Sequence, residues 1–357
     1  MVKIFYLGSI IHNNNYIDSL IINYIIKLGK IFMKYKFCHQ LKNSLFFSNN
    51  EILHCCPGVA EFAPKFLCNY FGNLFDKMQI INEKKYASLK SKNGQIPYLV
   101  CENCHKYEEQ DWDEDFRIKD ISISHWTACN CNCTYCFTSI DKQHFNSKPT
   151  YKIMPVLENI KDIIDFDGIV RFVGGDISQL DEFEDIINFF YSNGSNNFYI
   201  PTSGIKYVPI IDTLLKEGKA HVIISIDSGC EETYKKIKQV NSFKNVLDNM
   251  KKYSDAAKEG NCLFESKYII IPEINNNKEE ILKWFDICTD IGVKTIAIDF
   301  ETNFLKDKPN QIPANINELL NLIQKTANDR NIQVSYWNYL EQLLFGLEKG
   351  IYKIQNR

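Results

Sequence analysis

Four cysteines lie within eight residues of the segment "WTACNCNCTYCF", and their spacing is the strongest chemical signal in the chain. Cys129, Cys133 and Cys136 follow the pattern Cys-x3-Cys-x2-Cys, and Cys131 falls between them. Thiolates are the protein ligands of iron–sulfur clusters. Three of them can hold three irons of a [4Fe–4S] cluster and leave the fourth iron open to another molecule. The loop therefore predicts a cluster with an open coordination position.

A closed metal site is the alternative interpretation of the same loop. Structural zinc takes four ligands, and Cys131 could supply the fourth thiolate, which would leave only a structural or electron-transfer role. We interpret Cys131 as a bystander in the cluster loop, but the spacing alone leaves both possibilities open.

The Cys-x3-Cys-x2-Cys spacing, with the aromatic Tyr135 just before the last cysteine, resembles the radical SAM enzymes. The resemblance covers roughly residues 117 to 305. It implies that the open iron binds the amino and carboxylate groups of S-adenosylmethionine (SAM). It also implies that an electron from the reduced cluster breaks a C–S bond, and that the resulting 5′-deoxyadenosyl radical removes a hydrogen atom from a substrate.

The segment "FVGGDIS" is similar to the Gly-Gly-Glu motif with which this family holds the SAM amino group. Gly174 and Gly175 would let the backbone approach a ligand closely. Asp176 stands where the family has glutamate, so a direct contact with the ammonium group depends on a shorter side chain. Taken alone, a Gly-Gly pair is more often a simple turn.

Other polar residues follow later predicted strands in "PTSG", "SIDSG" and "ESKYIIIPEINNN", and the string "ISIDSGCEETYKKIK" also resembles a segment of many radical SAM proteins. Each residue alone could belong to an ordinary strand-end turn. Because several fall at the same end of the predicted sheet, the resemblance implies that they contact SAM. The candidates are Tyr135, Ser203, Ser225, Asp227 and Lys267, with Thr202 and Asn275 beside them.

A second set of cysteines precedes the predicted barrel. Four of five could ligate an auxiliary [4Fe–4S] cluster or a zinc ion, and the set is similar to the SPASM and twitch modules of radical SAM proteins, which normally follow the barrel. Unligated thiols remain an alternative, whereas haem attachment through "CENCH" is disfavoured without an export signal. The five are Cys55, Cys56, Cys68, Cys101 and Cys104. The scattered Cys38, Cys230, Cys262 and Cys288 are expected to be core residues.

Alternating strand and helix patterns from about residue 118 must position these groups. Six predicted strands, rich in Ile and Val, favour a parallel sheet, expected to be buried on both faces. We predict a partial (βα)6 TIM-like barrel with a cysteine-bearing N-terminal extension and a C-terminal helical tail; a doubly wound sheet is the alternative. Gly218, Gly260 and Gly292 are expected as left-handed helix caps. The predicted strands cover residues 118–124, 168–173, 196–202, 220–227, 266–272 and 293–299, with a further possible strand in "IQVSYWNY".

Three segments are expected: an extension over 1–116, the radical SAM barrel over 117–305 and a capping segment over 306–357. The chain has 357 residues and a net charge of −3, so it offers no electrostatic reason to bind nucleic acid or an anionic membrane. The start of the chain lacks a signal-peptide pattern. Residues 17–35 predict an amphipathic helix, because charged residues break the apolar run. We therefore expect a cytoplasmic protein.

The resemblance implies an oxygen-sensitive enzyme reduced by flavodoxin or ferredoxin. The N-terminal cysteines slightly favour a peptide or protein substrate, while a sugar, nucleotide or other small metabolite remains open. The alternative from another functional class is a non-catalytic iron–sulfur or zinc carrier or sensor on a degraded barrel. The replacement of glutamate by Asp176 is the one feature that lends this alternative support.

Overall fold

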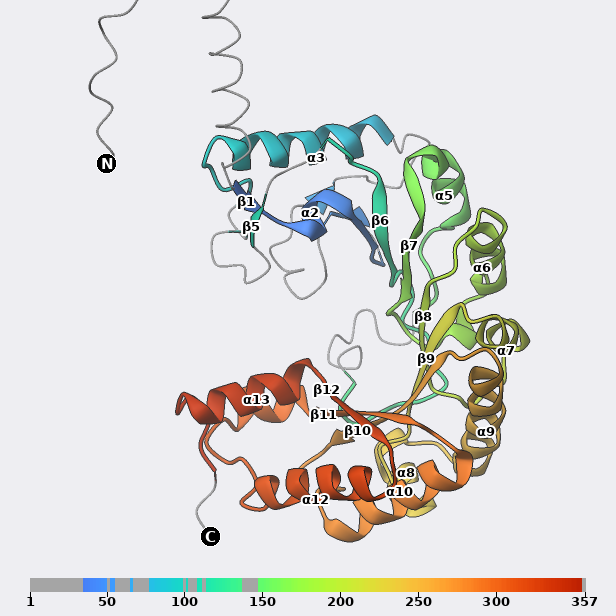
Figure 1. Ribbon diagram of the computed structural model, residues 1–357, viewed down its shortest axis with the longest axis vertical. Coiled ribbons are helices and arrows are strands. Elements are labelled where there is room, and N and C mark those ends of the chain that lie inside the picture. The colour runs from blue at the N-terminus through green and yellow to red at the C-terminus, as the bar shows by residue number, and fades with distance from the viewer. Residues whose placement is uncertain are drawn as a thin grey trace, which may run out of the picture.

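A curved sheet of mostly parallel strands, covered by helices on its outer side, runs through most of the described chain (Figure 1). The computed structural model describes residues 35–49, 52–54, 65–66, 77–98, 101, 108–110, 114–136 and 147–354. The expected amphipathic helix over 17–35 lies almost wholly outside these residues, as do Cys55, Cys56, Cys68 and Cys104.

All six predicted strands of the βα series are present. They are β6 (Ile118–Ile123), β7 (Ile164–Phe172), β8 (Phe198–Thr202), β9 (Ala220–Ser225), β10 (Leu263–Ile270) and β11 (Thr295–Phe300). Each strand pairs in parallel with the next one along the chain. A doubly wound sheet would reverse its strand order near the middle. The unbroken order over the described strands therefore confirms a partial-barrel architecture.

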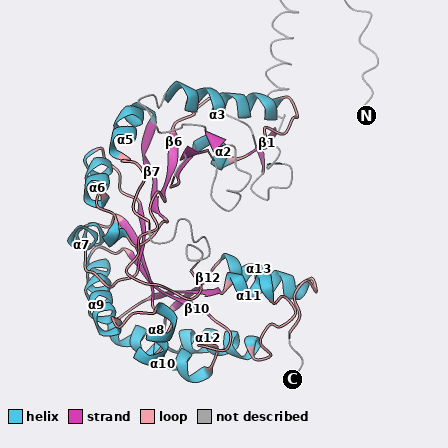
Figure 2. Cartoon of the chain, turned by 180° about the vertical axis from the view of Figure 1, so that it is seen from behind, coloured by secondary structure: helices cyan, strands magenta, loops and turns pink. Residues whose placement is uncertain are grey.

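The connecting helices lie along the convex side of the sheet (Figure 2). Each helix presents apolar side chains to the strands, and together they form one large core. These helices are α5 (Met154–Ile160), α6 (Phe183–Ser192), α7 (Pro209–Lys216), α8 (Glu231–Lys238), α9 (Phe243–Glu259) and α10 (Lys278–Ile291).

The two faces of the sheet differ in polarity more than the sequence pattern predicted. Val170 and Phe172 of β7 are buried in the core under the helices. Successive side chains of a strand point to opposite faces, so Arg171 between them points to the concave side. Tyr199 and His221, in register with it on the next strands, are likewise only half-buried. The expectation of two buried faces was therefore wrong where Arg171, Tyr199 and His221 line the concave side, whereas β11 is buried on both faces.

The sheet also extends beyond the six predicted strands at both ends. At one edge, β2 (Ser44–Phe47) pairs in parallel with β6, followed by antiparallel β3 (Ile52–Leu53) and β4 (Lys65–Phe66). At the other edge, β12 (Gln333–Tyr336) pairs in parallel with β11, which confirms the possible strand in "IQVSYWNY". Part of the N-terminal extension is thus continuous with the barrel sheet.

The remaining described elements flank the two ends of the arc. Near the N-terminal end are the antiparallel pair β1 (Tyr35–Phe37) and β5 (Glu108–Gln110), with helices α2 (His39–Asn43) and α3 (Lys77–Lys92). Near the C-terminal end are α11 (Thr302–Asp307), α12 (Ile316–Asp329) and α13 (Asn338–Glu348). Among the described residues, no helix combines the length and apolar character that crossing a membrane requires.

Two of the three expected glycine caps have the left-handed backbone that the pattern predicted. Gly218 and Gly292 have φ angles of 76° and 85°. Gly260 was predicted wrongly, because its φ is −87°. A Cβ atom there would lie 1.9 Å from the carbonyl oxygen of Leu215. Gly260 is therefore required by the close approach of two helix ends and not by its backbone angle.

Candidate functional site

The cysteine loop is anchored by backbone hydrogen bonds to the end of α8. The N–H groups of Asn132 and Thr134 donate to the carbonyl oxygens of Lys238 and Ile237, each at 3.0 Å. Orphan carbonyls at a helix C-terminus need such donors. The loop therefore takes its position from a helix about one hundred residues away in the sequence.

The thiols of this loop differ in acidity because Cys131 lies between two others. Its thiol lies within hydrogen-bond reach of both Cys129 and Cys133, and its single proton can be donated to one of them at a time. The bond from Cys131, together with the charge of Lys238, lowers the pKa of Cys133 to about 6. Hydrogen bonding from Cys131 also lowers the pKa of Cys129, whereas the pKa of Cys131 itself is raised. This pattern supports Cys129 and Cys133 as thiolate ligands and Cys131 as a protonated neighbour.

The donor set fits an iron–sulfur cluster better than a single metal ion. Within the described residues, no group of three His, Cys, Asp or Glu side chains is arranged to hold one ion. Each thiolate of a [4Fe–4S] cluster binds a different iron, so the sulfur atoms need not meet at one point. Cys129, Cys133 and Cys136 are all partly exposed on one loop. They would hold such a cluster.

Gly174 and Gly175 are needed because the backbone segment before the cysteine loop lies against them. A Cβ atom on Gly174 would lie 2.4 Å from the carbonyl oxygen of Trp126, and one on Gly175 would lie 2.1 Å from that of Ala128. The N–H of Gly175 donates to the Trp126 oxygen at 3.0 Å. The space left by both missing side chains is thus filled by protein, although the backbone could still face a ligand.

Asp176 is buried, and its carboxylate already accepts five hydrogen bonds. Oδ1 accepts from the backbone N–H of Ser178 at 3.0 Å, from the Ser178 hydroxyl and from Asn130 at 3.5 Å. Oδ2 accepts from the Thr202 hydroxyl at 2.9 Å and from the N–H of Ser203 at 2.6 Å. The carboxylate thus links the cysteine loop to the end of β8. The predicted contact with a SAM ammonium group would have to compete with these donors.

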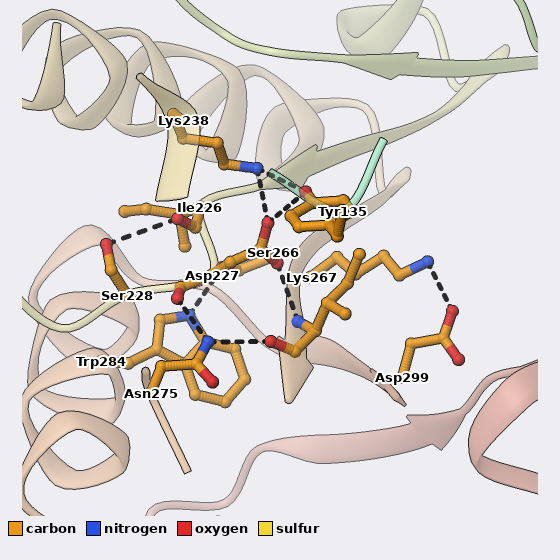
Figure 3. Close-up of polar contacts among 11 residues, drawn as sticks. Tyr135, Ile226, Asp227, Ser228, Lys238, Ser266, Lys267, Asn275, Trp284 and Asp299 are labelled. Atoms are coloured by element: carbon orange, nitrogen blue, oxygen red, sulfur yellow. Dashed lines mark hydrogen bonds and ion pairs between the residues drawn. The ribbon is translucent and has the colours of Figure 1, made fainter. Parts of the chain in front are cut away.

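Tyr135, Asp227 and Lys238 form a triangle beside the cysteine loop, in which Asp227 and Lys238 are buried and Tyr135 is half-buried (Figure 3). The Tyr135 hydroxyl donates to Asp227 Oδ2 at 2.5 Å, and Lys238 Nζ lies 2.7 Å from the hydroxyl and 2.5 Å from Oδ2. Burial and the Asp227 charge raise the pKa of Tyr135, so the phenol keeps its proton. Burial alone would lower the pKa of Lys238, but Asp227 and the neighbouring thiols of Cys133 and Cys131 together outweigh it and raise that pKa. Lys238 therefore stays a cation.

Asp227 and Asn275 hold the ends of β9 and β10 together. Asp227 Oδ1 accepts from the N–H of Ile269 at 2.8 Å, and the Asn275 amide donates to the Asp227 carbonyl at 2.8 Å. Asn275 Oδ1 in turn accepts from the N–H of Ile271. Asp227 has a φ of 56°, a left-handed angle that aspartate tolerates better than most residues. Both side chains are fully buried and hydrogen-bond to backbone groups.

Lys267 also points to the concave face but already has a carboxylate partner. Its Nζ lies 2.9 Å from Asp299 Oδ2 and 3.8 Å from the centre of the Trp337 ring. Asp299 Oδ1 accepts from the N–H groups of Tyr339 and Leu340 in the first turn of α13. Lys267 thus connects the barrel to the C-terminal segment, and its predicted contact with a SAM carboxylate remains a prediction.

The predicted SAM-contacting residues therefore fall into two groups along one edge of the sheet. The first group surrounds Asp176, whose carboxylate accepts a hydrogen bond from the N–H of Ser203. The second group lies at the ends of β9 and β10, where Ser225, half-buried, pairs in register with Lys267.

Sequence reasoning missed the polar residues on the concave face and the lysine of the triangle. Arg171 is paired with Asp120 on β6, with two contacts of 3.2 and 3.3 Å. His221 Nε2 lies 2.8 Å from Glu265 Oε2. A single charged residue inside an Ile- and Val-rich strand, as in "GIVRFV", is the signal that could have indicated them. The signal for Lys238 is its position four residues after Tyr234, which places both on the same face of α8.

Only Cys101 of the predicted auxiliary set lies within the described residues. It is buried in a small apolar cluster with Cys38, Leu41 and Phe46. None of the nine described cysteines forms a disulfide. Burial confirms the core assignment of Cys38 and Cys288, whereas Cys230 and Cys262 are only partly buried. The auxiliary cluster remains a prediction.

Comparisons with known proteins agree with this arrangement. Residues 123–298 match the family model described as the radical SAM superfamily. The chain is 27% identical over 191 residues to a GTP 3′,8-cyclase of Helicobacter pylori, covering 52% of this chain and 57% of that protein. It is 25% identical over 198 residues to a GTP 3′,8-cyclase of Lactiplantibacillus plantarum, covering 54% and 57%. The chain thus spans little more than half the length of these relatives.

Among solved structures, SuiB of Streptococcus suis bound to its precursor peptide SuiA superimposes with a TM-score of 0.51 and 13% identity. The match covers 93% of this chain and 65% of SuiB, and at this identity it shows the fold alone. The family match carries the assignment. Residues 123–298 are a domain of the radical SAM superfamily of enzymes, whose cofactors are a [4Fe–4S] cluster and SAM.

Proposed function

We propose that this chain is a radical SAM enzyme in which Cys129, Cys133 and Cys136 hold the catalytic [4Fe–4S] cluster. The observation that carries the proposal is the position of this loop at the carboxyl edge of the sheet, beside Asp176 and Asp227. Active sites of parallel βα architectures are assembled at this edge. When bound and reduced, the cluster supplies the electron that breaks a C–S bond of SAM and so generates the deoxyadenosyl radical.

The residues of this chain would position the reactants. The Asp176 group and the Asp227 triangle hold the cysteine loop against the ends of β7 to β9. Ser203, Ser225 and Lys267 lie at or near the same edge, where SAM would bind. The concave face below carries Arg171, His221 and other polar side chains, which would orient a substrate and exclude competing hydrogen donors. A reduced flavodoxin or ferredoxin would supply the electron.

A peptide or protein substrate remains the slightly favoured proposal. The inward cations Arg171 and Lys267 are each paired with a carboxylate. A triphosphate is normally held by cations that can give it their charge-assisted hydrogen bonds. This observation weighs against a nucleoside triphosphate on these two residues. The names of the GTP 3′,8-cyclase relatives favour the nucleotide alternative, and GTP is therefore the first small molecule to test.

The test is anaerobic reconstitution of the full chain followed by assay of iron, sulfide and 5′-deoxyadenosine with dithionite and SAM. The expected result is about four irons per chain, or about eight with an auxiliary cluster, together with deoxyadenosine formation. Cys133→Ala should abolish deoxyadenosine formation, while the matched control Cys131→Ala should retain it. Loss of activity in both variants would show that the ligand set was misassigned.

The substrate class is tested with the same preparation. Faster deoxyadenosine release with GTP than without it would favour a nucleotide substrate. Release stimulated only by peptides would favour peptide modification. Iron and sulfide without deoxyadenosine in every mixture would move the assignment to a non-catalytic carrier or sensor.

A further inference from the structure

Lys238 contacts the cysteine loop through both its backbone and its side chain. Its carbonyl oxygen accepts from the N–H of Asn132 at 3.0 Å, and its ammonium group lies 2.7 Å from the Tyr135 hydroxyl. The two contacts hold the loop on either side of Cys133. Lys238 is only 3% exposed. Burying an ammonium group costs several kcal/mol unless it is paired, and here Asp227 pairs it.

The charge of Lys238 also lies close to the cysteine loop. Its ammonium group lies 2.7 Å from the hydroxyl of Tyr135, the residue just before Cys136, and 5.1 Å from the centre of the Tyr135 ring. Asp227 places the opposite charge against the same hydroxyl. In a buried site these charges are poorly screened by solvent, so they act on any negative group that the loop carries.

We propose that Lys238 is a positioning residue for the cysteine loop, and that its charge favours the reduced state of the cluster held there. The inference rests on the proposed function, because it assumes a cluster on this loop. Three thiolates make such a cluster negative, and reduction adds one more negative charge. A nearby cation therefore stabilises the reduced form more than the oxidised form, while Asp227 opposes this effect.

The experiment uses three substitutions in α8 of the full chain. Lys238→Met removes the charge at similar length, Lys238→Arg keeps the charge, and Lys235→Met removes an exposed charge from the same helix as a matched control. Each protein is reconstituted anaerobically, its iron is counted, and its midpoint potential is measured by a redox titration followed by electron paramagnetic resonance. We expect a lower potential for Lys238→Met and a potential near wild type for the other two variants. Full iron content with an unchanged potential in Lys238→Met would overturn the electrostatic part of the proposal.

A second measurement needs no cluster and tests the positioning role. The cluster-free proteins are treated with iodoacetamide, and alkylation of Cys133 is followed by peptide mass spectrometry. The rates are compared at the alkaline plateau of their pH dependence, where Cys133 is fully ionised, because loss of a nearby cation also changes the fraction of thiolate. On this basis Lys238→Met and Tyr135→Phe should both alkylate on the order of tenfold faster than wild type, because each loses a hydrogen bond that anchors the loop. Lys235→Met should match wild type. Equal rates in all four proteins would overturn the positioning role.

The two measurements also separate this inference from the proposed function. If the wild-type protein assembles no cluster, or assembles one that does not cleave SAM, the proposed function fails while the alkylation rates still test Lys238. If the wild-type protein cleaves SAM and Lys238→Met changes neither the potential nor the alkylation rate, only the role of Lys238 fails.

Discussion

Two buried aspartates hold the two ends of the cysteine loop, and they do so in different ways. Asp176 and Asp227 are 2% and 0% exposed. Asp176 faces only neutral donors, including Asn130 at the start of the loop. Asp227 faces a lysine and a tyrosine, and Tyr135 lies near the end of the loop. The first carboxylate is stabilised by neutral donors alone, and the second by one full positive charge beside the Tyr135 hydroxyl and the N–H of Ile269.

The difference predicts how each end responds to change. Where several neutral donors share a charge, the loss of one leaves the others in place. Where one cation balances one anion in a buried site, removing either leaves the other uncompensated. We therefore expect the Asp176 end to lose stability in small steps and the Asp227 end in one large step.

The largest effect is expected from Asp227→Asn. The new amide can turn its oxygen towards the N–H of Ile269, but its NH2 group then faces the Lys238 ammonium. We expect a loss of about 3–5 kcal/mol in the free energy of unfolding, because a buried cation is left unpaired. Urea unfolding of the cluster-free protein measures it. A loss below about 1 kcal/mol would mean that Lys238 can reach solvent and that the triangle is not a buried ion pair.

An intermediate effect is expected from pH at the Asp176 end, where His125 precedes the loop. His125 is fully buried, and burial lowers its pKa from 6.5 to about 4. Neither ring nitrogen has a hydrogen-bond partner among the described residues. The unfolded chain therefore binds the proton more readily, so this stability is present above pH 6.5 and is lost as the pH falls towards 4. The loss amounts to about 3 kcal/mol.

Unfolding at a series of pH values checks this expectation. In His125→Phe the dependence between pH 6.5 and 4 should become flatter than in wild type, since the titrating ring is gone. If the two proteins lose stability in parallel over this range, His125 is not the group responsible.

The smallest effect is expected from Asp176→Asn, the same chemical change at the other aspartate. The fixed N–H groups of Ser178 and Ser203 donate to different carboxylate oxygens. An asparagine can accept only one of them, whichever way its amide is turned, so one backbone N–H loses its partner. We expect a loss of about 1–3 kcal/mol in the free energy of unfolding. A loss equal to or larger than that of Asp227→Asn would reverse the proposed contrast between the two ends.

Much of the barrel could be predicted from the sequence because its strands and helices have local signatures. Runs such as "AHVIISID" and the cap at Gly292 depend on neighbouring residues only. The strand β2 was missed because its partner β6 lies more than seventy residues away, and a four-residue strand has little signal of its own. Gly260 was misinterpreted for a related reason, since the contact that requires it comes from another helix.

The spacing of the cysteines in the loop, and the order of strands and helices that places the loop at a sheet edge, can be read from the sequence alone. Only the tertiary structure decided which charges meet there. Tyr135 and Lys238 are 103 residues apart in the sequence. Tyr135 lies 92 residues from Asp227 and Lys238 lies 11 residues from it. Their contact depends on how α8 packs after β9 and on how the loop lies against its end. The sequence pattern can indicate that a carboxylate will be buried. Which cation neutralises it depends on the packing of elements that are far apart in the sequence.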